Sequence, residues 1–368
     1  MHRERLQRLS TGMEHQKITA MAFNSGPSLT YLTGLHFHLM ERPVVLLVTP
    51  GKQPVLILPE LEQGKLDQAA CGLTAMTYPE NPDNWPTVFR QALDDLKLGK
   101  GRIGVEPRQF RLLEYNYLFS ANDNVSITDG SNLIASLRSV KDHGEIEAMK
   151  QAVTIAQEAL KATLPLARIG MSEKDLANEL VIQLLRQGSD PALPFSPIVS
   201  AGPNAANPHA KPSERKLSAG DLLIIDWGAS CRNYVSDLTR TFAVGEVESE
   251  YHRIHNTVQM ANRAGREAGK PGVACKMIDH AARVVIESAG YGDQFTHRTG
   301  HGIGMECHED PYIRGDNEEI LEAGMAYTVE PGIYLGGRNG VRIEDTVVVT
   351  AAGAQSLSDL PRELVTIC

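Results

Sequence analysis

Four acidic residues form two similar pairs in the second half of this chain. Asp226 ends the apolar run LLIID and Glu330 ends the apolar run AYTVE, and each is followed by a second acid, Asp237 or Glu344. An acid at the end of a buried strand needs compensation, because an unpaired buried carboxylate is costly or is forced to take up a proton. One such acid alone would be interpreted as a solvated hairpin residue, but two pairs in matching places indicate a shared site.

The matching places follow from an internal repeat. Glycines bound a helical segment at residues 170–188 and another of the same length at residues 272–290, 102 positions later. Residues 218–228 match residues 322–332 at a shift of 104 positions, which makes the first acids of the two pairs equivalent. We therefore expect two half-domains, each a helix pair followed by a hairpin, with a pseudo-twofold site between them.

The first acid pair lies on an expected hairpin at residues 222–244, since LLIID and VSDLTRTF are both typical of strands. With its tight turn at Cys231 and Arg232, this hairpin places Asp226 directly opposite Asp237. Cross-strand Cβ atoms in such a pair are about 4.5–5.5 Å apart. Both carboxylates then point to one face of the hairpin.

A second hairpin is expected at residues 326–350, with a glycine-rich turn at residues 336–340. Symmetric pairing about Gly337 sets Glu330 opposite Glu344. Four carboxylates aimed at one pocket repel one another, so cations must compensate them. Two divalent ions balance four carboxylate charges, and oxygen-rich ligation with one imidazole suits Mn²⁺, Co²⁺ or Fe²⁺ better than a structural zinc site.

The candidate for the imidazole ligand is His301, in the segment HRTGHGIG. Glycines around it allow the backbone to approach neighbouring groups closely. The sequence thus predicts a metal centre built from two hairpins and this loop.

The elements that carry this centre belong to the second of two expected domains. Residues 17–61 contain the short apolar runs ITAMAF, VVLLVT and VLILP, and a further strand is expected at residues 101–105, which is typical of a small α/β domain. Helices follow at about residues 144–167 and 172–187, the second of them begun by a capping box. We place the domain boundary before these helices, which gives an N-terminal domain at residues 1–140 and a C-terminal domain at residues 141–368.

Composition excludes several classes of function. The chain has 368 residues and 42% hydrophobic content, enough for two cores, and its net charge of −9 argues against nucleic acid as a partner. Five scattered cysteines without CxxC spacing argue against a disulfide framework or a structural zinc site. No apolar run has the length of a signal peptide or a membrane span. We therefore expect a cytoplasmic protein that acts on small molecules or peptides, with no membrane partner.

Several longer segments resemble those of a known family. IIDWGASCRNYVSDLTRTF, HRTGHGIGMECHEDPYI, YTVEPGIYL, GVRIEDTVVVT and the loop SAGPNAANPHA are similar to the metal-binding blocks of the pita-bread metallopeptidases. The similarity is to the branch of Xaa-Pro dipeptidases (prolidases) and aminopeptidases P, and it extends more loosely to the N-terminal part through YLTGLH. It implies an α/β (α+β) chain with a small creatinase/prolidase-like N-terminal domain and a pita-bread catalytic domain of pseudo-twofold αα-ββ design.

The resemblance also implies the metal ligands. They are Asp226, Asp237, His301, Glu330 and Glu344, none of which is substituted here. Asp237 and Glu344 are expected to contact both of two divalent ions, with Mn²⁺ or Co²⁺ favoured and Zn²⁺ or Fe²⁺ as alternatives. The intact set argues against the metal-free binding proteins and the creatine hydrolase that share this fold.

Catalytic and substrate-binding roles follow from the same resemblance. Glu330 is the expected proton acceptor for an attacking water, and His209 and His308 are expected to contact substrate and stabilise the developing oxyanion or amine. His297 matches a position at the substrate pocket. Without the resemblance, His209 and His308 would each be interpreted as a surface loop histidine.

Arg342 lies two residues before Glu344, so strand alternation puts both side chains on one face. Its guanidinium could bind the terminal carboxylate of a dipeptide, or it could only offset local negative charge. Thr239 and Thr346 share the faces of Asp237 and Glu344, and their hydroxyls could orient those ligands.

We therefore expect a dinuclear-metal Xaa-Pro dipeptidase that cleaves the bond before proline in short peptides. The alternative within the same chemistry is aminopeptidase P, which accepts longer peptides, and the alternative from another class is a non-catalytic binding protein on the same fold. A homodimer is expected from the resemblance and from residues 36–42, where HFHLMER gathers aromatic, imidazole and apolar groups.

Overall fold

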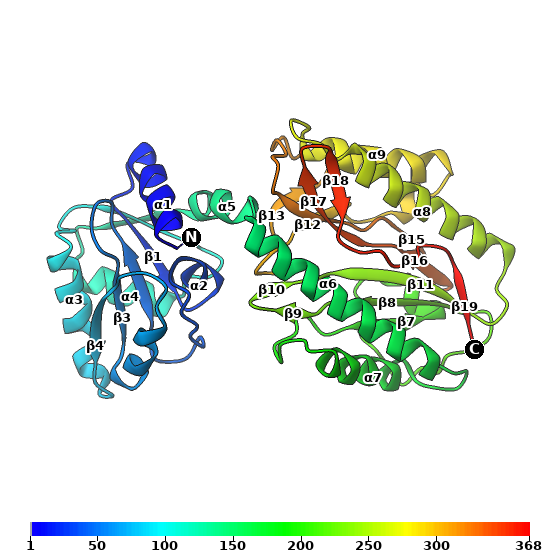
Figure 1. Ribbon diagram of the computed structural model, residues 1–368, viewed down its shortest axis with the longest axis horizontal. Coiled ribbons are helices and arrows are strands. Elements are labelled where there is room, and N and C mark those ends of the chain that lie inside the picture. The colour runs from blue at the N-terminus through cyan, green and yellow to red at the C-terminus, as the bar shows by residue number, and fades with distance from the viewer. Residues whose placement is uncertain (1) are drawn as a thin grey trace. The chain divides into compact units, whose positions relative to one another are not determined.

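The structure is a computed structural model that describes residues 2–368. The chain divides into two compact units, of which the first ends at Leu137 and the second runs from Arg138 to Cys368 (Figure 1). Helix α5 (Ser131–Ser139) contains the boundary. Within the described residues, no helix has the length and apolar character needed to cross a bilayer.

The first unit is built on one mixed sheet of six strands in the order β4-β3-β2-β1-β5-β6. Strand β2 pairs antiparallel with both β1 and β3, and the three other pairings are parallel. The strands are β1 (Ala20–Asn24), β2 (Val45–Val48), β3 (Val55–Pro59), β4 (Thr74–Tyr78), β5 (Arg102–Val105) and β6 (Ser126–Asp129). The helices are α1 (His2–Gln16), α2 (Pro27–Thr33), α3 (Trp85–Asp95) and α4 (Leu112–Ala121), with 3₁₀ helices η1 (Glu60–Gln68) and η2 (Pro82–Asn84).

The apolar runs singled out in the sequence form the middle of this sheet. They become β1, β2, β3 and β5, and their side chains pack with Trp85 and Phe89 of α3 in one buried cluster. Short apolar runs separated by glycine and proline therefore did indicate strands, and the expected small α/β domain is confirmed.

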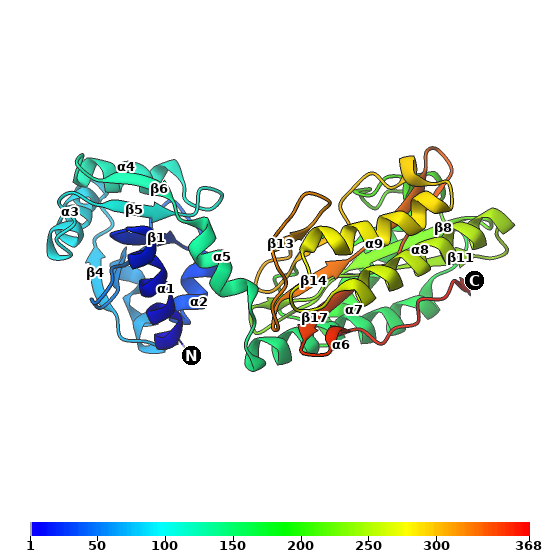
Figure 2. The ribbon, with the colours of Figure 1, turned by 90° about the horizontal axis from the view of Figure 1, so that it is seen from above.

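The second unit consists of two helix pairs packed against strands that are antiparallel except for the parallel pair β11 and β19 (Figures 1 and 2). One sheet has the order β19-β11-β8-β7, another has the order β13-β12-β14-β17-β18, and two ribbons pair β9 with β10 and β15 with β16. The helices are α6 (His143–Thr163), α7 (Glu173–Arg186), α8 (Ser249–Ala268) and α9 (Cys275–Ser288), with 3₁₀ helices η3 (Leu164–Leu166), η4 (Gly202–Ala206) and η5 (Gly292–Gln294).

The strands of the first half of this unit are β7 (Ile198–Ala201), β8 (Leu222–Trp227), β9 (Ser230–Cys231), β10 (Tyr234–Val235) and β11 (Leu238–Val244). Those of the second half are β12 (Gly300–Gly302), β13 (Glu309–Ile313), β14 (Ala326–Val329), β15 (Gly332–Leu335), β16 (Asn339–Arg342), β17 (Asp345–Thr350), β18 (Gly353–Ser356) and β19 (Val365–Ile367). Apolar side chains of α6 and α7 pack with β8 around Trp227, and those of α9 pack with β14 and β17. Each helix pair thus shares a core with its own hairpin.

The internal repeat is present in the structure. Helices α7 and α9 have equal lengths and are displaced by 102 positions at both ends, as the bounding glycines predicted. Gly170 and Gly272, which precede them, have φ of 87° and 86°, a left-handed conformation that favours glycine. An isolated antiparallel bridge joins Ser172 to Lys216 in the first half, and the bridge from Ala274 to Ile320 is its counterpart in the second. The expected pseudo-twofold pita-bread architecture is confirmed.

The second hairpin has the predicted register. Val329 pairs with Asp345 and Gly332 pairs with Arg342, so Glu330 and Glu344 face each other between two ladders of the same register. The turn passes through Gly337 at a φ of 74°. A glycine-rich turn with one residue at its centre was therefore sufficient to fix this pairing.

The predicted register of the first hairpin is wrong by one position on each strand. The turn residues are Arg232 and Asn233, with φ of 52° and 67°, and Asp226 pairs with Thr239 instead of Asp237. A two-residue hairpin turn of this kind requires positive φ at both central residues, and asparagine adopts that conformation more readily than cysteine. Moving the turn by one residue changes the partner of Asp226 by two residues, from Asp237 to Thr239. Because side chains alternate between faces with a period of two, Asp226 and Asp237 stay on the same face.

The two hairpins meet at the acids. Thr239 and Glu344 form an antiparallel bridge, in which the Glu344 N–H donates to the Thr239 carbonyl at 3.0 Å. This bridge connects the two halves at the point where the internal repeat predicts the site.

Candidate active site

A cavity of about 830 Å³ opens in the second unit at this junction. Its wall includes all nine residues to which the sequence analysis assigned a metal-binding, catalytic or substrate-binding role: His209, Asp226, Asp237, His297, His301, His308, Glu330, Arg342 and Glu344. The apolar part of the wall comes from residues 194–198 and from Pro208 and Pro212. The structure thus brings together residues that lie up to 135 positions apart in the sequence, from His209 to Glu344.

Donor atoms suited to a metal ion converge at one end of the cavity. One ligand atom each of Asp237, His301 and Glu344 lie within 4.8 Å of one another. The His301 Nε2 atom lies 3.6 Å from Asp237 Oδ2 and 3.4 Å from Glu330 Oε1. These distances bring acids from both hairpins to one imidazole.

The glycines on either side of His301 allow the strand that carries this imidazole to pack closely against its neighbours. A Cβ atom on Gly300 would lie 1.9 Å from the Thr328 carbonyl oxygen, and one on Gly302 would lie 2.2 Å from that of Asp310. Only glycine therefore lets strand β12 pack so closely between its neighbours. Burial lowers the pKa of His301 well below its ordinary value, which keeps the ring neutral and a lone pair available to a metal.

Among the residues that the structure describes, the carboxylates of the site have too few hydrogen-bond partners and positive charges to offset their burial. Asp226 Oδ1, Asp237 Oδ1 and Glu344 Oε1 are buried and have no hydrogen-bond partner among residues 2–368. Burial, and then the neighbouring carboxylates, raise the pKa of both Asp237 and Glu344 well above the ordinary range. Burial also raises the pKa of Glu330 to about 7, with Arg342 opposing that shift. Divalent cations would replace the protons that such a cluster otherwise takes up, so these residues fit a metal centre.

Two threonines support the acids from behind. The Thr239 hydroxyl donates to Glu344 Oε2 at 2.7 Å, and the Thr346 hydroxyl donates to the Asp237 carbonyl at 2.9 Å. Thr239 therefore orients the acid of the opposite hairpin, and Thr346 fixes the backbone of Asp237 without contacting its carboxylate.

Arg342 lies at the centre of a chain of hydrogen bonds along the cavity wall. Its guanidinium donates to Asp226 Oδ2 at 2.6 Å and to the Tyr334 hydroxyl at 3.0 Å. Tyr334 lies 2.8 Å from His297 Nε2, and His297 Nδ1 lies 2.7 Å from the Arg298 carbonyl. The carbonyl can only accept, so this network assigns the proton to Nδ1 and makes Tyr334 the donor to Nε2. Both ring nitrogens of His297 thus have hydrogen-bond partners in this network.

The other two histidines differ in their surroundings. His209 is exposed on the loop after η4, and its backbone N–H donates to Asn207 Oδ1 at 3.1 Å. His308 packs edge-on against His301, with ring centroids 4.1 Å apart. Burial, followed by the charge of Arg298, lowers the pKa of His308. Both rings line the cavity near the acids and carry nitrogens that can reach a bound molecule.

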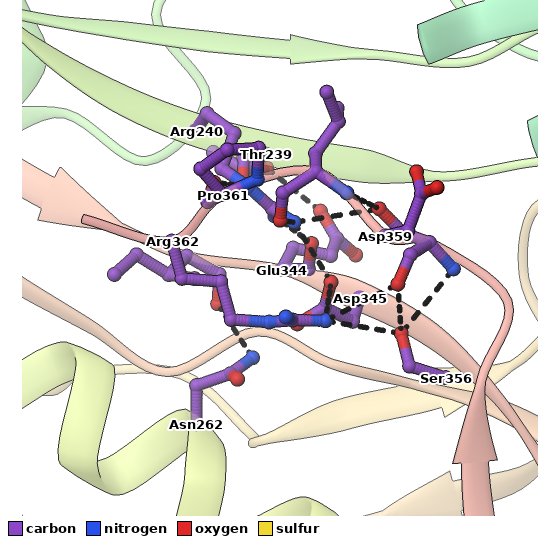
Figure 3. Close-up of polar contacts among 12 residues, drawn as sticks. Thr239, Arg240, Asn262, Glu344, Asp345, Ser356, Asp359, Pro361 and Arg362 are labelled. Carbon is purple, nitrogen blue, oxygen red and sulfur yellow. Dashed lines mark hydrogen bonds and ion pairs between the residues drawn. The ribbon is translucent and has the colours of Figure 1, made fainter. Parts of the chain in front are cut away.

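A buried ion network lies directly behind Glu344. Asp345 is fully buried, and Figure 3 shows Arg240 and Arg362 directed at its carboxylate. The Arg240 contact is 2.9 Å and the Arg362 contact is 2.7 Å, while Arg266 lies 3.6 Å away. Arg240 also donates to the Glu344 carbonyl at 2.6 Å. The network therefore connects the metal-site hairpins to the C-terminal segment that carries Arg362.

Some residues in or next to the cavity wall were missed from the sequence. Tyr334, the hydrogen-bond partner of Arg342 and His297, could have been found, because the correctly predicted register of the second hairpin puts it on the same face as Arg342. Cys307 and Arg298 also line the cavity, next in sequence to His308 and His297. Residues 194–198 carry no motif, and only the fold brings them to the site.

Comparisons with known proteins cover both units. Residues 147–351 match Metallopeptidase family M24, and residues 5–140 match the Creatinase/Prolidase N-terminal domain. The Xaa-Pro dipeptidase of Lactobacillus helveticus is 34% identical over 349 residues, which cover 94% of this chain and 94% of that protein.

Two solved structures are similar in fold to nearly the whole chain. A dipeptidase from Pyrococcus horikoshii OT3 is similar with a TM-score of 0.93 and 36% identity, covering 99% of this chain and 100% of that chain. An X-Pro aminopeptidase from Thermotoga maritima MSB8 is similar with a TM-score of 0.85 and 31% identity, covering 98% of this chain and 99% of that chain.

The fold and the acid-lined cavity define a pita-bread metallopeptidase. The chain belongs to Metallopeptidase family M24, in its prolidase branch. Membership of this family implies divalent metal ions, in agreement with the carboxylate and imidazole donors of the cavity.

Proposed function

We propose that this protein is a dinuclear-metal Xaa-Pro dipeptidase, which hydrolyses the bond before proline in dipeptides. The observation that carries the proposal is a set of four carboxylates and one neutral imidazole that line a single cavity. Asp226, Asp237 and Glu344 are buried, Glu330 is 17% exposed, and the imidazole is that of His301. Asp237 and Glu344, one from each hairpin, would contact both ions of such a centre. Mn²⁺ and Co²⁺ fit this oxygen-rich set best, because the donors are carboxylates with a single ring nitrogen.

Divalent ions held by these carboxylates and His301 would make a water nucleophilic at neutral pH and would polarise the scissile carbonyl. Glu330 accepts the proton of the attacking water and passes it to the leaving imino nitrogen of proline. Its Oε1 atom lies 3.4 Å from His301 Nε2, and its side chain lines the cavity in which the attacking water would be held. His209 and His308 donate to the developing oxyanion or to the leaving group, since both carry ring nitrogens on the cavity wall.

The apolar wall is consistent with a proline-containing substrate. Pro194, Phe195 and Pro197 line the same cavity as the acids and offer a surface on which a pyrrolidine ring can pack. The similar proteins named above include an Xaa-Pro dipeptidase and an X-Pro aminopeptidase, so the alternative for this chain is release of the N-terminal residue from longer Xaa-Pro peptides.

The deciding experiment compares two substrates on the Mn²⁺-loaded protein. An Xaa-Pro dipeptide and the corresponding Xaa-Pro-Xaa tripeptide are hydrolysed side by side, and kcat/KM is measured for each. A clear preference for the dipeptide is expected. Preference for the tripeptide would support the aminopeptidase P alternative, and hydrolysis of neither would favour a binding protein.

Arg342→Ala is expected to raise KM for an Xaa-Pro dipeptide by about 10–100-fold, because hydrogen bonds to a charged group contribute about 1.5–3 kcal/mol. The reason is that its guanidinium lines the cavity and could hold the free carboxylate of the dipeptide. Steady-state kinetics on a dipeptide and its C-terminal amide measure this effect, and the loss should be much smaller for the amide.

The matched control for this variant is Arg338→Ala, which removes an exposed arginine from the turn of the same hairpin. Equal losses on the free and amidated substrates would give Arg342 a different role. It would then act by holding Asp226, its ion-pair partner at 2.6 Å, and metal affinity should fall as well.

We also propose a homodimer. The support is the family resemblance together with residues 36–42, where Leu39 is 52% exposed although a small domain has no need to expose such a run. Sedimentation at micromolar concentration should give twice the chain mass of 40.2 kDa. A monomer that keeps full activity at high dilution would contradict a functional dimer.

A further inference from the structure

The cavity contains a thiol that the proposed mechanism does not use. Cys307 Sγ lies 3.1 Å from Asp237 Oδ2, in the segment between β12 and β13. Among the five cysteines of the described chain, only Cys307 lines the cavity; Cys71, Cys231 and Cys275 are buried elsewhere and Cys368 is exposed. Its sulfur is therefore next to the cluster of metal donors.

The surrounding atoms independently point to a ligand at this place. Asp237 and Glu344 are only 5% and 1% exposed, yet Asp237 Oδ1 and Glu344 Oε1 have no hydrogen-bond partner within residues 2–368. The other oxygen of Asp237 is approached by both the Cys307 sulfur and, at 3.6 Å, by His301 Nε2. The sulfur and the ring nitrogen thus approach the same carboxylate oxygen of Asp237.

The spacing of sulfur and oxygen is close to that of two ligands of one ion. Zinc bonds thiolate sulfur at about 2.3 Å and carboxylate oxygen at about 2.0–2.2 Å, so two such ligands at the tetrahedral angle are about 3.6 Å apart. The distance from Cys307 Sγ to Asp237 Oδ2 is 3.1 Å. A shift of the sulfur by about 0.5 Å would therefore replace its hydrogen bond with a metal bond.

We propose that Cys307 is a sulfur ligand for thiophilic divalent ions such as Zn²⁺ and Cd²⁺ at the metal centre, in addition to the carboxylates and His301. On binding, the S–H bond breaks, a metal–sulfur bond forms, and the proton leaves to solvent with no change of oxidation state. Soft ions gain most from a thiolate, whereas Mn²⁺ prefers the oxygen donors. Cys307 thus sets which metals the protein retains, and this inference rests on the metal centre of the proposed function.

The test is a Cd²⁺ titration of the metal-free full-length chain, read by absorption in the near ultraviolet, where cadmium thiolates absorb. The titration uses Cys368→Ser as background, because that exposed thiol could bind Cd²⁺ by itself. A thiolate band that saturates with bound Cd²⁺ is expected, and adding Cys307→Ser should abolish it. Adding Cys231→Ser instead, which removes a thiol outside the cavity, should leave the band unchanged.

Affinity provides the second readout. Cys307→Ser should weaken Cd²⁺ binding by at least about tenfold, since even partners behind a metal ligand typically contribute 10–100-fold. Mn²⁺ affinity should change little. Absence of the band in the Cys368→Ser protein, or an unchanged band after Cys307→Ser, overturns the inference whether or not the variant is fully stable.

Hydrolysis of an Xaa-Pro dipeptide by the Mn²⁺-loaded Cys368→Ser protein separates the two ideas. Activity without a thiolate band overturns the role of Cys307 alone and leaves the proposed function standing. Failure to bind either ion, with no hydrolysis, overturns the metal centre and therefore both.

Discussion

Replacing Asp237 or Glu344 with alanine is expected to remove the metal centre and to lower Xaa-Pro hydrolysis by on the order of 10³-fold or more. Metal-assisted hydrolysis draws several kcal/mol of transition-state stabilisation from its ions, and about 1.36 kcal/mol corresponds to a factor of ten in rate. The two acids come from different hairpins, and their ligand atoms lie with that of His301 within 4.8 Å. Loss of either acid therefore removes a metal ligand that the other hairpin cannot replace. Metal content per chain and kcat/KM are the measurements.

Two further variants make this test specific. Asp237→Asn keeps the size of the side chain and removes its charge, so it should lose metal nearly as completely as the alanine variant. Glu318→Ala removes an exposed glutamate of the same unit and should change neither quantity. Two ions per chain and normal turnover in either Asp237→Ala or Glu344→Ala would show that the ligand assignment is wrong.

The fold could be predicted from the sequence wherever a short local pattern, such as a glycine or a turn with one possible centre, allowed only one structure. The glycines at positions 170 and 272 ended up in equivalent left-handed turns, and the helices that follow them have the displacement read from the sequence. The second hairpin has a glycine-rich turn with a single centre, so its register was determined. The first hairpin offered Cys231, Arg232 and Asn233 as turn residues, and choosing among them required the positive φ values that only the structure gives.

The candidate site could be predicted as a set of residues but not as a set of contacts. Strand alternation placed Arg342 beside Glu344, yet its ion pair is with Asp226, 116 positions earlier in the chain. Thr239 was expected to support Asp237 or Glu344 and turned out to contact Glu344 across the bridge between the hairpins. Such contacts depend on how two hairpins pack, and no spacing within one hairpin encodes that packing.

The network behind the site was not foreseen for the same reason. Asp345 follows Glu344 directly, and one apolar strand continues from it, so its sequence context resembles that of an ordinary strand residue. Its partners Arg240 and Arg362 come from a different hairpin and from the C-terminal segment. The grouping of these three charged side chains can only be recognised once these segments are adjacent in space (Figure 3).

Asp345→Ala is expected to lower the free energy of unfolding by about 3–5 kcal/mol, the usual effect of removing one partner of a buried ion pair. The reason is that Arg240, whose side chain is only 4% exposed, would keep its charge without a carboxylate. Arg362 is 19% exposed and can turn toward water, so it contributes less to this loss. Chemical denaturation followed by circular dichroism measures the effect. Asp316→Ala, which removes one partner of an exposed ion pair, is the control and should cost less than about 1 kcal/mol.

The pH dependence identifies the charge of Asp345 as the cause. Burial alone would raise the pKa of this carboxyl, but Arg240 and Arg362 outweigh burial and lower it below its ordinary value. A carboxyl with a depressed folded-state pKa stabilises the fold above its unfolded pKa of about 3.9, and that contribution disappears as the pH falls through the folded value. The stability difference between the natural protein and Asp345→Asn should therefore be constant from neutral pH down to about pH 5 and shrink in stronger acid. A difference that stays the same at every pH would attribute the loss to packing of the side chain and not to its charge.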